Sequence, residues 1–396
     1  MIIGVVGKPN VGKSTFFKAM TLAEVEIANY PFATIKPNQG VGYVKVDCVD
    51  KEFKVQCNPR MGYCLDGKRF VPIELIDVAG LVPGAHEGLG MGNQFLDDLN
   101  QADALIHVID VAGTTNEKGE SVEAGNYDPV EDVKFLEKEL DMWYLRILEK
   151  GWEKFKRKIK AEGSNISIAI AKQLSGLRVD EDIAKEAIKE LKLPADIINW
   201  TDDELYSLAS LLRKKTKPMI IAANKADVST GADNLKRLQE EFKDEIIIGC
   251  SSESELALKE AAKKEMIDYI PGEKDFTLKE GLNDNQKKAL EFIKSNVLDK
   301  YGSTGVQEVM DKLIFDVLGM IVIFPGGVNN LVDKNGNVLP DCFLLKDGST
   351  ALDFAYKIHQ DLGDKFIRAI DVKTKRTVGK DHKLKNRDVI EIIAGK

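Results

Sequence analysis

The chain has 396 residues, of which 43% are hydrophobic and 30% are charged, and its formal net charge is −8. This length suffices for two or three domains that each bury a core, and no apolar run approaches the ~20 residues that a membrane-spanning helix needs. The acidic balance argues against indiscriminate nucleic-acid binding by the whole chain. Because the first apolar run leads directly into a glycine motif, we expect no cleavable leader, a cytoplasmic location and no membrane partner.

Five short apolar runs predict buried parallel strands. They span residues 2–6, 71–76, 104–109, 218–223 and 246–249. Several of these runs end in a polar or glycine-rich loop, which is typical of a doubly wound α/β sheet whose ligands bind at the carboxyl ends of the strands. The stretch 44–70 contains the turn signals Asn58-Pro59 and Asp66-Gly67 and predicts a hairpin-like excursion.

The five cysteines are odd in number and form no C-x-x-C pair, so they do not indicate a secreted disulfide framework. Three of them, Cys48, Cys57 and Cys64, fall within the same excursion. A metal site there is conceivable, but the sequence shows no fourth ligand and leaves the question open.

The third and fourth runs are separated by about 100 residues with helical periodicity. Apolar residues recur there at spacings of three and four, as at Leu136, Leu140 and Trp143. This pattern predicts an inserted helical subdomain over 116–215, with a long antiparallel pair as one arrangement. We interpret its apolar stripes as packed core and its basic runs as solvated faces.

The remainder predicts a helical connector over 276–319 and a small β-rich domain over 320–396. In the latter, strand-like runs surround Thr350-x-x-Asp353, a capping box that would open a helix closed by Gly363. Asn335-Gly336 is a hairpin turn signal. A small sheet wrapped on one helix is the simplest interpretation.

Residues 7–14 read GKPNVGKS and match the phosphate-binding pattern G-x-x-x-x-G-K-S between a strand and a helix. In such a loop, backbone N–H groups cradle phosphate oxygens at the positive end of the helix. Lys13 would reach the β- and γ-phosphates, and Ser14 would ligate Mg²⁺. The predicted phosphate-binding residues are Asn10, Val11, Gly12, Lys13, Ser14 and Thr15.

Two further segments predict contacts to Mg²⁺ and to the γ-phosphate. Asp77 follows the second strand-like run and could hold Mg²⁺ through its water shell, while the Gly80 amide could meet the γ-phosphate. Between the two phosphate motifs, Thr34 in the sequence YPFAT could offer its hydroxyl to Mg²⁺ and its amide to the phosphate. The predicted metal ligands are Ser14, Thr34 and Asp77, and Lys13, Thr34 and Gly80 are catalytic candidates.

The sequence NKAD at 224–227 follows the fourth run and predicts guanine recognition. Asp227 can accept the N1–H and exocyclic amine of guanine, donors that adenine does not present in this arrangement. Asn224 would brace the loop and the Lys225 stem would cover the base. Ser251 and Ser252 could offer a backbone amide to the guanine O6. These motifs predict a GTP-binding domain over 1–115 and 216–275.

The motif sequences GKPNVGKS at 7–14, NYPFAT at 29–34, DVAGLVPGAH at 77–86 and CSSESE at 250–255 resemble those of TRAFAC-class GTPases of the Obg superfamily, in particular the YchF-like branch. The resemblance covers nearly the whole chain, and the tail from about 320 resembles a TGS domain, a β-grasp module. It implies a P-loop GTPase with a coiled helical insertion and an association with ribosomes or RNA. Members that have lost the N-K-x-D form prefer ATP, whereas this chain retains it.

Leu81 stands where many GTP hydrolases place a glutamine that orients the attacking water, and a leucine side chain cannot hydrogen-bond water. The resemblance implies membership of a group with a hydrophobic residue at this position. Asn10 resembles the asparagine that helps hold K⁺ in cation-dependent relatives, and His86 could instead position water. Either compensation predicts slow intrinsic hydrolysis that a cation or a partner raises.

The combined prediction is a Mg²⁺-dependent GTPase that cycles between GTP and GDP states and acts with a ribosome or RNA through its helical insertion and TGS-like tail. Residues 373–387 hold seven Lys or Arg against one Asp, which indicates either a phosphate-binding patch or a solvated β-surface. Two alternatives stay open: an ATP-preferring hydrolase, and a nucleotide-gated RNA- or ribosome-binding module with incidental hydrolysis.

Overall fold

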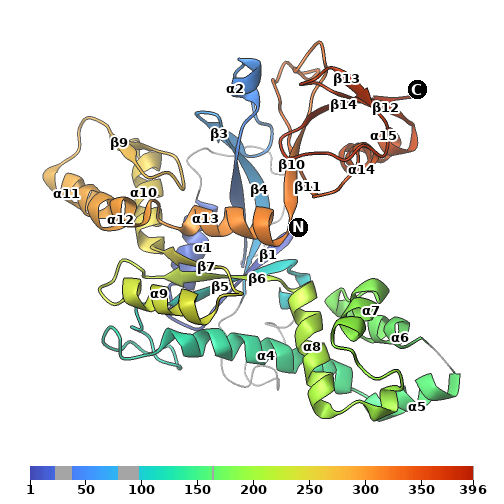
Figure 1. The fold of residues 1–396 in the computed structure, drawn as a ribbon. Coiled ribbons are helices and arrows are strands. Elements are labelled where there is room, and N and C mark those ends of the chain that lie inside the picture. Colours follow the sequence, from blue (N-terminus) through green and yellow to red (C-terminus); the bar gives the residue numbers. More distant parts are fainter. Residues whose placement is uncertain (23–37, 79–97, 163–164, 396) are drawn as a thin grey trace. The chain divides into compact units, whose positions relative to one another are not determined.

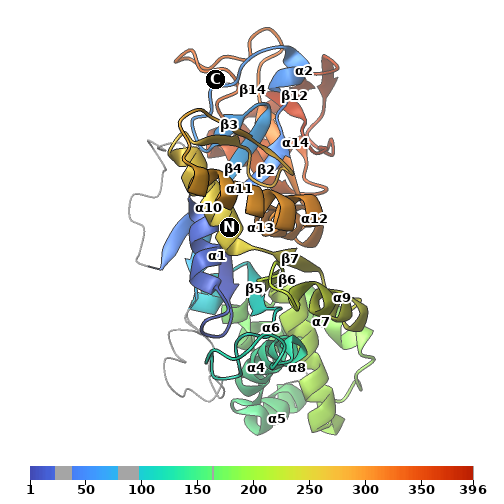
Figure 2. The ribbon, with the colours of Figure 1, turned by 90° about the vertical axis from the view of Figure 1, so that its left-hand side faces the viewer.

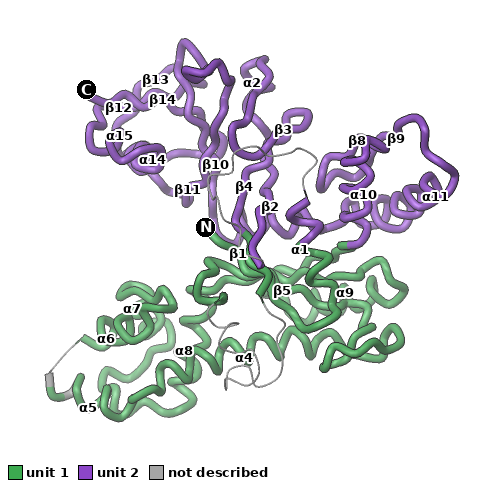
Figure 3. The backbone as a smooth tube through the Cα atoms, turned by 180° about the vertical axis from the view of Figure 1, so that it is seen from behind, with its two compact units in different colours: residues 1–17, 75–252 green, residues 18–74, 253–396 purple. Residues whose placement is uncertain are grey.

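The computed structural model covers residues 1–396 and describes all of them except 23–37, 79–97, 163–164 and 396 (Figure 1). The chain divides into two compact units (Figure 3). The first unit comprises Met1–Phe17 and Leu75–Ser252, and the second comprises Lys18–Glu74 and Glu253–Lys396. Within the described residues, no helix has both the length and the apolar character required to cross a membrane.

The first unit is built on a parallel sheet, as the apolar runs predicted. Its strands are β1 (Ile2–Val6), β5 (Ala104–Asp110), β6 (Met219–Asn224) and β7 (Ile247–Cys250), which pair in that order, and the end of β4 (Lys68–Asp77) lies on the other side of β1. The pairings of β1 with β5, β5 with β6 and β6 with β7 are parallel. Helices α1 (Lys13–Thr21) and α9 (Gly231–Glu241) follow β1 and β6. The predicted doubly wound α/β class is confirmed.

The insertion is helical, but its arrangement differs from the expected antiparallel pair. Residues 116–128 form a loop, and the helices are α4 (Pro129–Glu149), α5 (Trp152–Glu162), α6 (Ile166–Gln173), α7 (Glu181–Glu190) and α8 (Asp202–Thr216). Figure 1 shows that α4 and α8 cross instead of running antiparallel side by side, and Figure 2 shows the same two helices after a turn of 90°. The prediction of an antiparallel pair is therefore wrong.

The physical reason for this difference is that the core of the insertion is continuous with the core of the sheet. Apolar side chains of α4 and α8, such as Leu136 and Leu208, share one hydrophobic cluster with Val6 and Leu105 of the sheet. Where the two helices cross, Tyr144 Oη lies 2.7 Å from Thr216 Oγ1. Periodicity marks an apolar face but not the element against which that face packs.

In the second unit, β2 (Gln39–Asp47), β3 (Tyr63–Leu65) and the start of β4 pair side by side, with β4 between its two neighbours. β3 and β4 are antiparallel and are joined through Asp66-Gly67, which confirms the predicted turn. Between β2 and β3 lies the short helix α2 (Asp50–Phe53). β2 was not predicted, because Gly40 and Gly42 interrupt its apolar pattern.

A helical segment follows in the same unit, after helix α10 (Ser252–Lys263) and a hairpin of β8 (Ile267–Tyr269) with β9 (Phe276–Leu278). Its α-helices are α11 (Asp284–Ile293), α12 (Asp299–Tyr301) and α13 (Val306–Lys312). Two π-helical turns, Lys294–Leu298 and Leu313–Val317, interrupt the series. Helices thus occupy this segment from Asp284 onward, and the hairpin before them was not predicted from the sequence.

The C-terminal part of the second unit is a five-stranded sheet with the order β11-β10-β14-β12-β13. Its strands are β10 (Met320–Pro325), β11 (Phe343–Lys346), β12 (Phe366–Asp371), β13 (Arg376–Val378) and β14 (Val389–Ala394). α14 (Ala351–Ile358) packs on this sheet through Phe354, and α15 (Gln360–Asp364) follows it.

The predicted capping box at the start of α14 is confirmed. Asp353 N donates to Thr350 Oγ1 at 3.2 Å, and Thr350 N donates to Asp353 Oδ2 at 2.7 Å. The predicted end of the helix at Gly363 is wrong, because His359 adopts an extended conformation with φ −163° and breaks the helix there. Gly363 instead lies within α15.

Candidate nucleotide-binding site

The loop at residues 7–14 connects β1 with α1 and requires glycine at two positions of close approach. A Cβ atom at Gly7 would lie 2.4 Å from the Val108 carbonyl oxygen, and one at Gly12 would lie 2.2 Å from Asn224 Nδ2. Gly12 also has a φ of +91°, in the region that side chains disfavour. The backbone of this loop can therefore approach β5 and β6 only because these two residues lack side chains.

Asn224, the last residue of β6, joins this loop to the loop after β7. Its Nδ2 donates to Val11 O at 2.9 Å, and its Oδ1 accepts from Ser252 N at 3.1 Å and from Ser252 Oγ at 2.7 Å. Asn224, Ser251 and Ser252 are all buried. The structure thus brings three of the sequence-predicted segments together through one side chain.

Lys225 lies beside the same loop in a left-handed conformation with φ 63°. Its Nζ donates to Asn10 O at 3.2 Å and pairs with Asp110 Oδ2 at 2.9 Å. Asp110 ends β5 opposite Asn224 in the parallel register, is fully buried, and also accepts from Thr114 Oγ1 at 2.5 Å. Sequence reasoning missed Asp110, although an acidic residue at the end of a run that is apolar except for His107 is a signal that could have identified it.

Lys8 is a second residue that the sequence analysis missed. It is 5% exposed, and its Nζ pairs with Asp132 Oδ1 of α4 at 2.8 Å, donates to Thr115 O at 2.8 Å and lies 3.7 Å from the centre of the Tyr127 ring. Burial raises the pKa of Asp132 to about 6, which the charge on Lys8 partly opposes. This buried pair connects the candidate phosphate loop to the helical insertion.

Asn10 and Pro9 contact the loop that follows β5. Asn10 Nδ2 donates to Gly119 O at 2.8 Å. A Cβ atom at Gly119 would lie 2.8 Å from Pro9 Cβ, so this position also requires glycine. The non-helical start of the insertion therefore packs directly on the phosphate loop, which the sequence analysis did not anticipate.

The predicted phosphate lysine and the predicted magnesium aspartate are in contact. Lys13 Nζ forms an ion pair with Asp77 Oδ1 at the end of β4. Ser14 is exposed and Thr15 half-buried in the first turn of α1. These side chains lie at the carboxyl ends of the strands, where ligands bind in sheets of this class.

The segment with Asp227 lies against the segment with Ser251. Ala226 N donates to Cys250 O at 3.0 Å, and Asp227, the next residue, is half-buried. The four other sequence-predicted positions of interest, Thr34, Gly80, Leu81 and His86, fall outside the described residues.

Three family models match the chain. The model for the 50S ribosome-binding GTPase matches residues 2–141, that for the Obg-like GTPase YGR210-like, G4 motif-containing domain matches residues 222–328, and that for the TGS domain matches residues 329–394. A GTP-binding protein of Methanocaldococcus jannaschii is 53% identical over 394 residues, and the match covers 99% of each chain. The ribosome-binding ATPase YchF of Bacillus subtilis is 33% identical over 273 residues, which cover 66% of this chain and 69% of that protein. The chain belongs to the YchF-like branch of the Obg-like GTPases.

Solved structures agree with this family membership. The crystal structure of a GTP-binding protein from Pyrococcus horikoshii is 42% identical, with a TM-score of 0.79 and complete coverage of both chains. The YchF GTPase of Schizosaccharomyces pombe is 22% identical, with a TM-score of 0.60 over 99% of this chain and 97% of that one, and shows the same fold. The resemblance drawn from the motifs is confirmed. The residues that the TGS model matches contain β11 to β14 with α14 and α15, whereas β10 of the same sheet lies in the segment that the preceding model matches.

Proposed function

We propose that this YchF-like protein is a cytoplasmic nucleotide switch that binds GTP with Mg²⁺, hydrolyses it to GDP and phosphate, and acts at the ribosome. The observation that carries the proposal is the position of Asn224. One buried side chain holds Val11 of the phosphate loop and Ser252 of the loop after β7. Asp227 follows three residues later. In this proposal, Asn224 connects the residues that recognise the base to the loop that binds the phosphates.

Mg²⁺ suits the oxygen donors that the site provides. Ser14 offers a hydroxyl and Asp77 a carboxylate. The contact between Lys13 and Asp77 supports the proposal that these two side chains face the same phosphate position. When bound, Mg²⁺ would supply positive charge against the β- and γ-phosphates. Lys13 would add a second positive charge to the same oxygens, and the backbone amides of residues 11–15 would orient them. Thr34 and Gly80 complete the proposed site.

Hydrolysis requires that the attacking water be oriented, and the side chain of Leu81 cannot hydrogen-bond that water. Asn10 and His86 are the two proposed compensations. Because Asn10 Nδ2 donates to Gly119 O, the remaining atom of this amide that can face a cation is Oδ1. A potassium ion held there would place charge against the phosphates, whereas His86 would position the water itself.

The first test is nucleotide turnover by the purified protein with Mg²⁺, comparing GTP with ATP and potassium with sodium. We expect GTP preference, slow turnover in sodium and faster turnover in potassium. Potassium-independent GTP turnover would direct attention from Asn10 to His86. Negligible turnover in potassium, also with ribosomes present, would instead favour a binding module with incidental hydrolysis.

Replacing Asp227 tests whether this residue selects guanine over other bases. Hydrogen bonds to a charged acceptor contribute about 1.5–3 kcal/mol, so Asp227→Asn should weaken GTP binding by roughly 10- to 150-fold. Xanthosine triphosphate has a carbonyl in place of the guanine amine, so the same variant should bind it better than wild type does. Asp233→Asn on α9 is the matched control and should change neither affinity.

An ATP-preferring hydrolase remains the second candidate, because the Bacillus subtilis relative is named a ribosome-binding ATPase. Higher turnover of ATP than of GTP by the wild-type protein, unchanged by Asp227→Asn, would establish this alternative and contradict guanine selection.

A further inference from the structure

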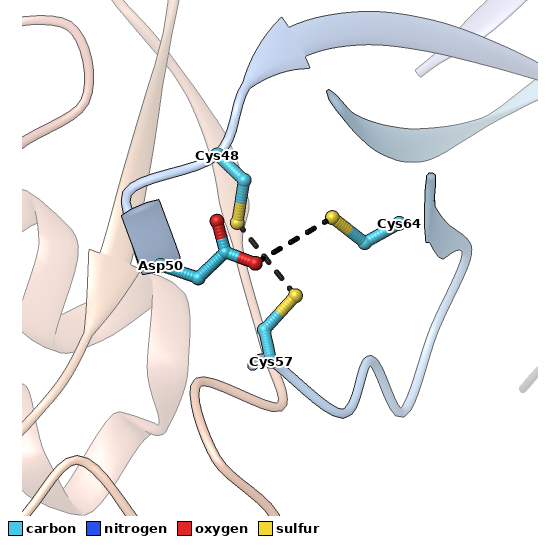
Figure 4. Close-up of side chains that lie close together, drawn as sticks. All are labelled: Cys48, Asp50, Cys57 and Cys64. Atoms are coloured by element: carbon cyan, nitrogen blue, oxygen red, sulfur yellow. Dashed lines mark hydrogen bonds between the residues drawn. The ribbon is translucent and has the colours of Figure 1, made fainter. Parts of the chain in front are cut away.

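Three cysteines and one aspartate meet at one point in the second unit. Cys48 directly follows β2, Asp50 opens α2, Cys57 lies in the loop after α2, and Cys64 lies in β3. One ligand atom from each of these residues lies within 4.8 Å of the corresponding atom of every other. Their side chains point toward a common centre (Figure 4). We refer to these four residues as the cysteine cluster.

The distances within the cysteine cluster fit the tetrahedral coordination of a metal ion. Cys48 Sγ and Cys57 Sγ are 3.7 Å apart, and Cys64 Sγ and Asp50 Oδ2 are 3.9 Å apart. Zinc bonds of about 2.3 Å to sulfur and about 2.0 Å to oxygen place neighbouring ligand atoms roughly 3.5–3.8 Å apart in a tetrahedron. The two measured distances correspond to opposite edges of such a tetrahedron. Asp50 Oδ1 accepts from Lys51 N at 2.7 Å, which orients Oδ2 toward the thiols.

The surroundings of the cysteine cluster also favour a cation. Asp50 is 1% exposed, Cys48 2% and Cys57 3%, while Cys64 is half-buried. Burying a carboxylate among thiols is costly unless a cation or a hydrogen-bond network compensates. The buried guanidinium of Arg69 lies close enough to interact electrostatically with Cys342, Cys57 and Cys48, and it supplies positive charge beside the cluster.

We propose that the cysteine cluster is a structural zinc site with three thiolate ligands and one carboxylate ligand. Thiolates select zinc over magnesium and calcium, which prefer oxygen ligands. Four ligands from the protein close the coordination shell, which is typical of structural rather than catalytic zinc. On binding, each thiol releases its proton to solvent, and the positively charged Arg69 offsets part of the excess negative charge of the ligands.

The zinc site would order a segment that contacts the start of the TGS domain. Asn58 N donates to Val338 O at 2.8 Å, and Arg60 N donates to Pro340 O at 2.9 Å. Arg60 Nε also donates to Asp341 Oδ1 at 3.1 Å. Both donor residues lie between Cys57 and Cys64, so fixing these two cysteines fixes the loop that makes the contacts.

Metal analysis of the full-length protein tests the proposal. The protein is purified under reducing conditions, incubated with a small excess of zinc, desalted and analysed for metal by mass spectrometry. We expect about one zinc per chain in wild type and a loss of most of it in the double variant Cys57→Ala with Cys64→Ala. Cys250→Ala is the matched control, because Cys250 is a buried cysteine of β7 outside the cysteine cluster, and it should retain the zinc.

Cobalt provides a spectroscopic readout that does not depend on nucleotide turnover. Wild type loaded with Co²⁺ should show a thiolate-to-cobalt charge-transfer band and the intense visible bands of tetrahedral geometry. Asp50→Asn keeps the three thiols and the size of the side chain, so it should fold and show at least a tenfold weaker affinity for zinc. Wild type without bound zinc and without these bands would overturn the proposal. A Cys48–Cys57 disulfide in place of metal, or undiminished zinc in the double variant, would also overturn it.

Discussion

At the scale of single residues, the burial of His107 makes the stability of the protein depend on pH. It lies within β5 and is 3% exposed. Burial, with a smaller contribution from the charge on Lys8, lowers the pKa of His107 to about 3. An unfolded histidine has a pKa of about 6.5. Between these two values the unfolded chain binds a proton that the folded protein does not, so the free energy of unfolding falls as the pH falls.

The predicted loss of stability from His107 is at most about 1.4 kcal/mol per pH unit below pH ~6.5, with no contribution above it. His107→Leu should therefore reduce the decline in unfolding free energy between about pH 6 and pH 4.5 relative to wild type. Urea unfolding at several pH values measures this slope. His382→Gln, at an exposed position, is the control and should change the slope less than His107→Leu does. Parallel curves for His107→Leu and wild type would contradict the prediction.

At the scale of elements, the start of α8 illustrates how local chemistry sets a helix boundary. Glu204 N donates to Thr201 Oγ1 at 3.2 Å, and Thr201 N donates to Glu204 Oε2 at 2.8 Å. Further along, α8 carries Arg213, whose Nε donates to Asp141 of α4 at 2.8 Å. The capping box thus defines the start of the helix that crosses α4 in the insertion.

Removing this cap should destabilise the protein by a predictable amount. Thr201→Ala should lower the free energy of unfolding by about 1 kcal/mol, because the Glu204 amide in the first turn of α8 loses the Thr201 hydroxyl that accepts its hydrogen bond. Thr201→Ser retains the hydroxyl, so its loss of unfolding free energy should be only a few tenths of the loss caused by Thr201→Ala. Denaturant unfolding of both variants provides the comparison, and equal losses would show that the hydroxyl does not cap α8.

At the scale of the whole molecule, internal ion pairs use part of the predicted basic patch at 373–387. Lys373 pairs with Glu52 at 2.7 Å, and Arg387 pairs with the same carboxylate. Lys383, although exposed, donates to the Gly348 carbonyl oxygen. The four other basic residues of the patch are exposed and remain accessible to a phosphate backbone; these are Lys375, Arg376, Lys380 and Lys385. The TGS domain therefore retains a smaller positive surface than the sequence alone indicated.

Under the proposed ribosomal role, this surface should contribute to ribosome binding. Lys375→Glu with Arg376→Glu should weaken co-sedimentation with ribosomes and reduce its salt dependence, by a slope of roughly 0.7–0.9 per lost phosphate contact. Lys287→Glu with Lys288→Glu on α11 makes the same change in charge elsewhere and should have no such effect.

Wild type should also bind differently with GDP and with a non-hydrolysable GTP analogue, and equal binding in both states would contradict a switch.

The sequence by itself determined the features that depend on contiguous residues. The apolar runs identified the parallel sheet, and GKPNVGKS and NKAD identified the candidate nucleotide site, because each pattern requires particular side chains at short fixed spacings. The capping box at Thr350 and the turn at Asp66-Gly67 were predictable for the same reason. Each is a local hydrogen-bonding or backbone preference that needs no distant partner.

Tertiary structure decided the features that depend on residues far apart. Lys8 and Asp132 are separated by 124 positions, and Asp110 and Lys225 by 115, so no local pattern pairs them. The same limit applied to the crossing of α4 and α8, because an apolar stripe does not specify its partner. Asp50 was not predicted as a metal ligand, because aspartates are common in sequences. Only in the folded chain does its carboxylate lie beside the three thiols. Sequence thus determines which chemical groups are present, and packing determines which of them come close enough to interact.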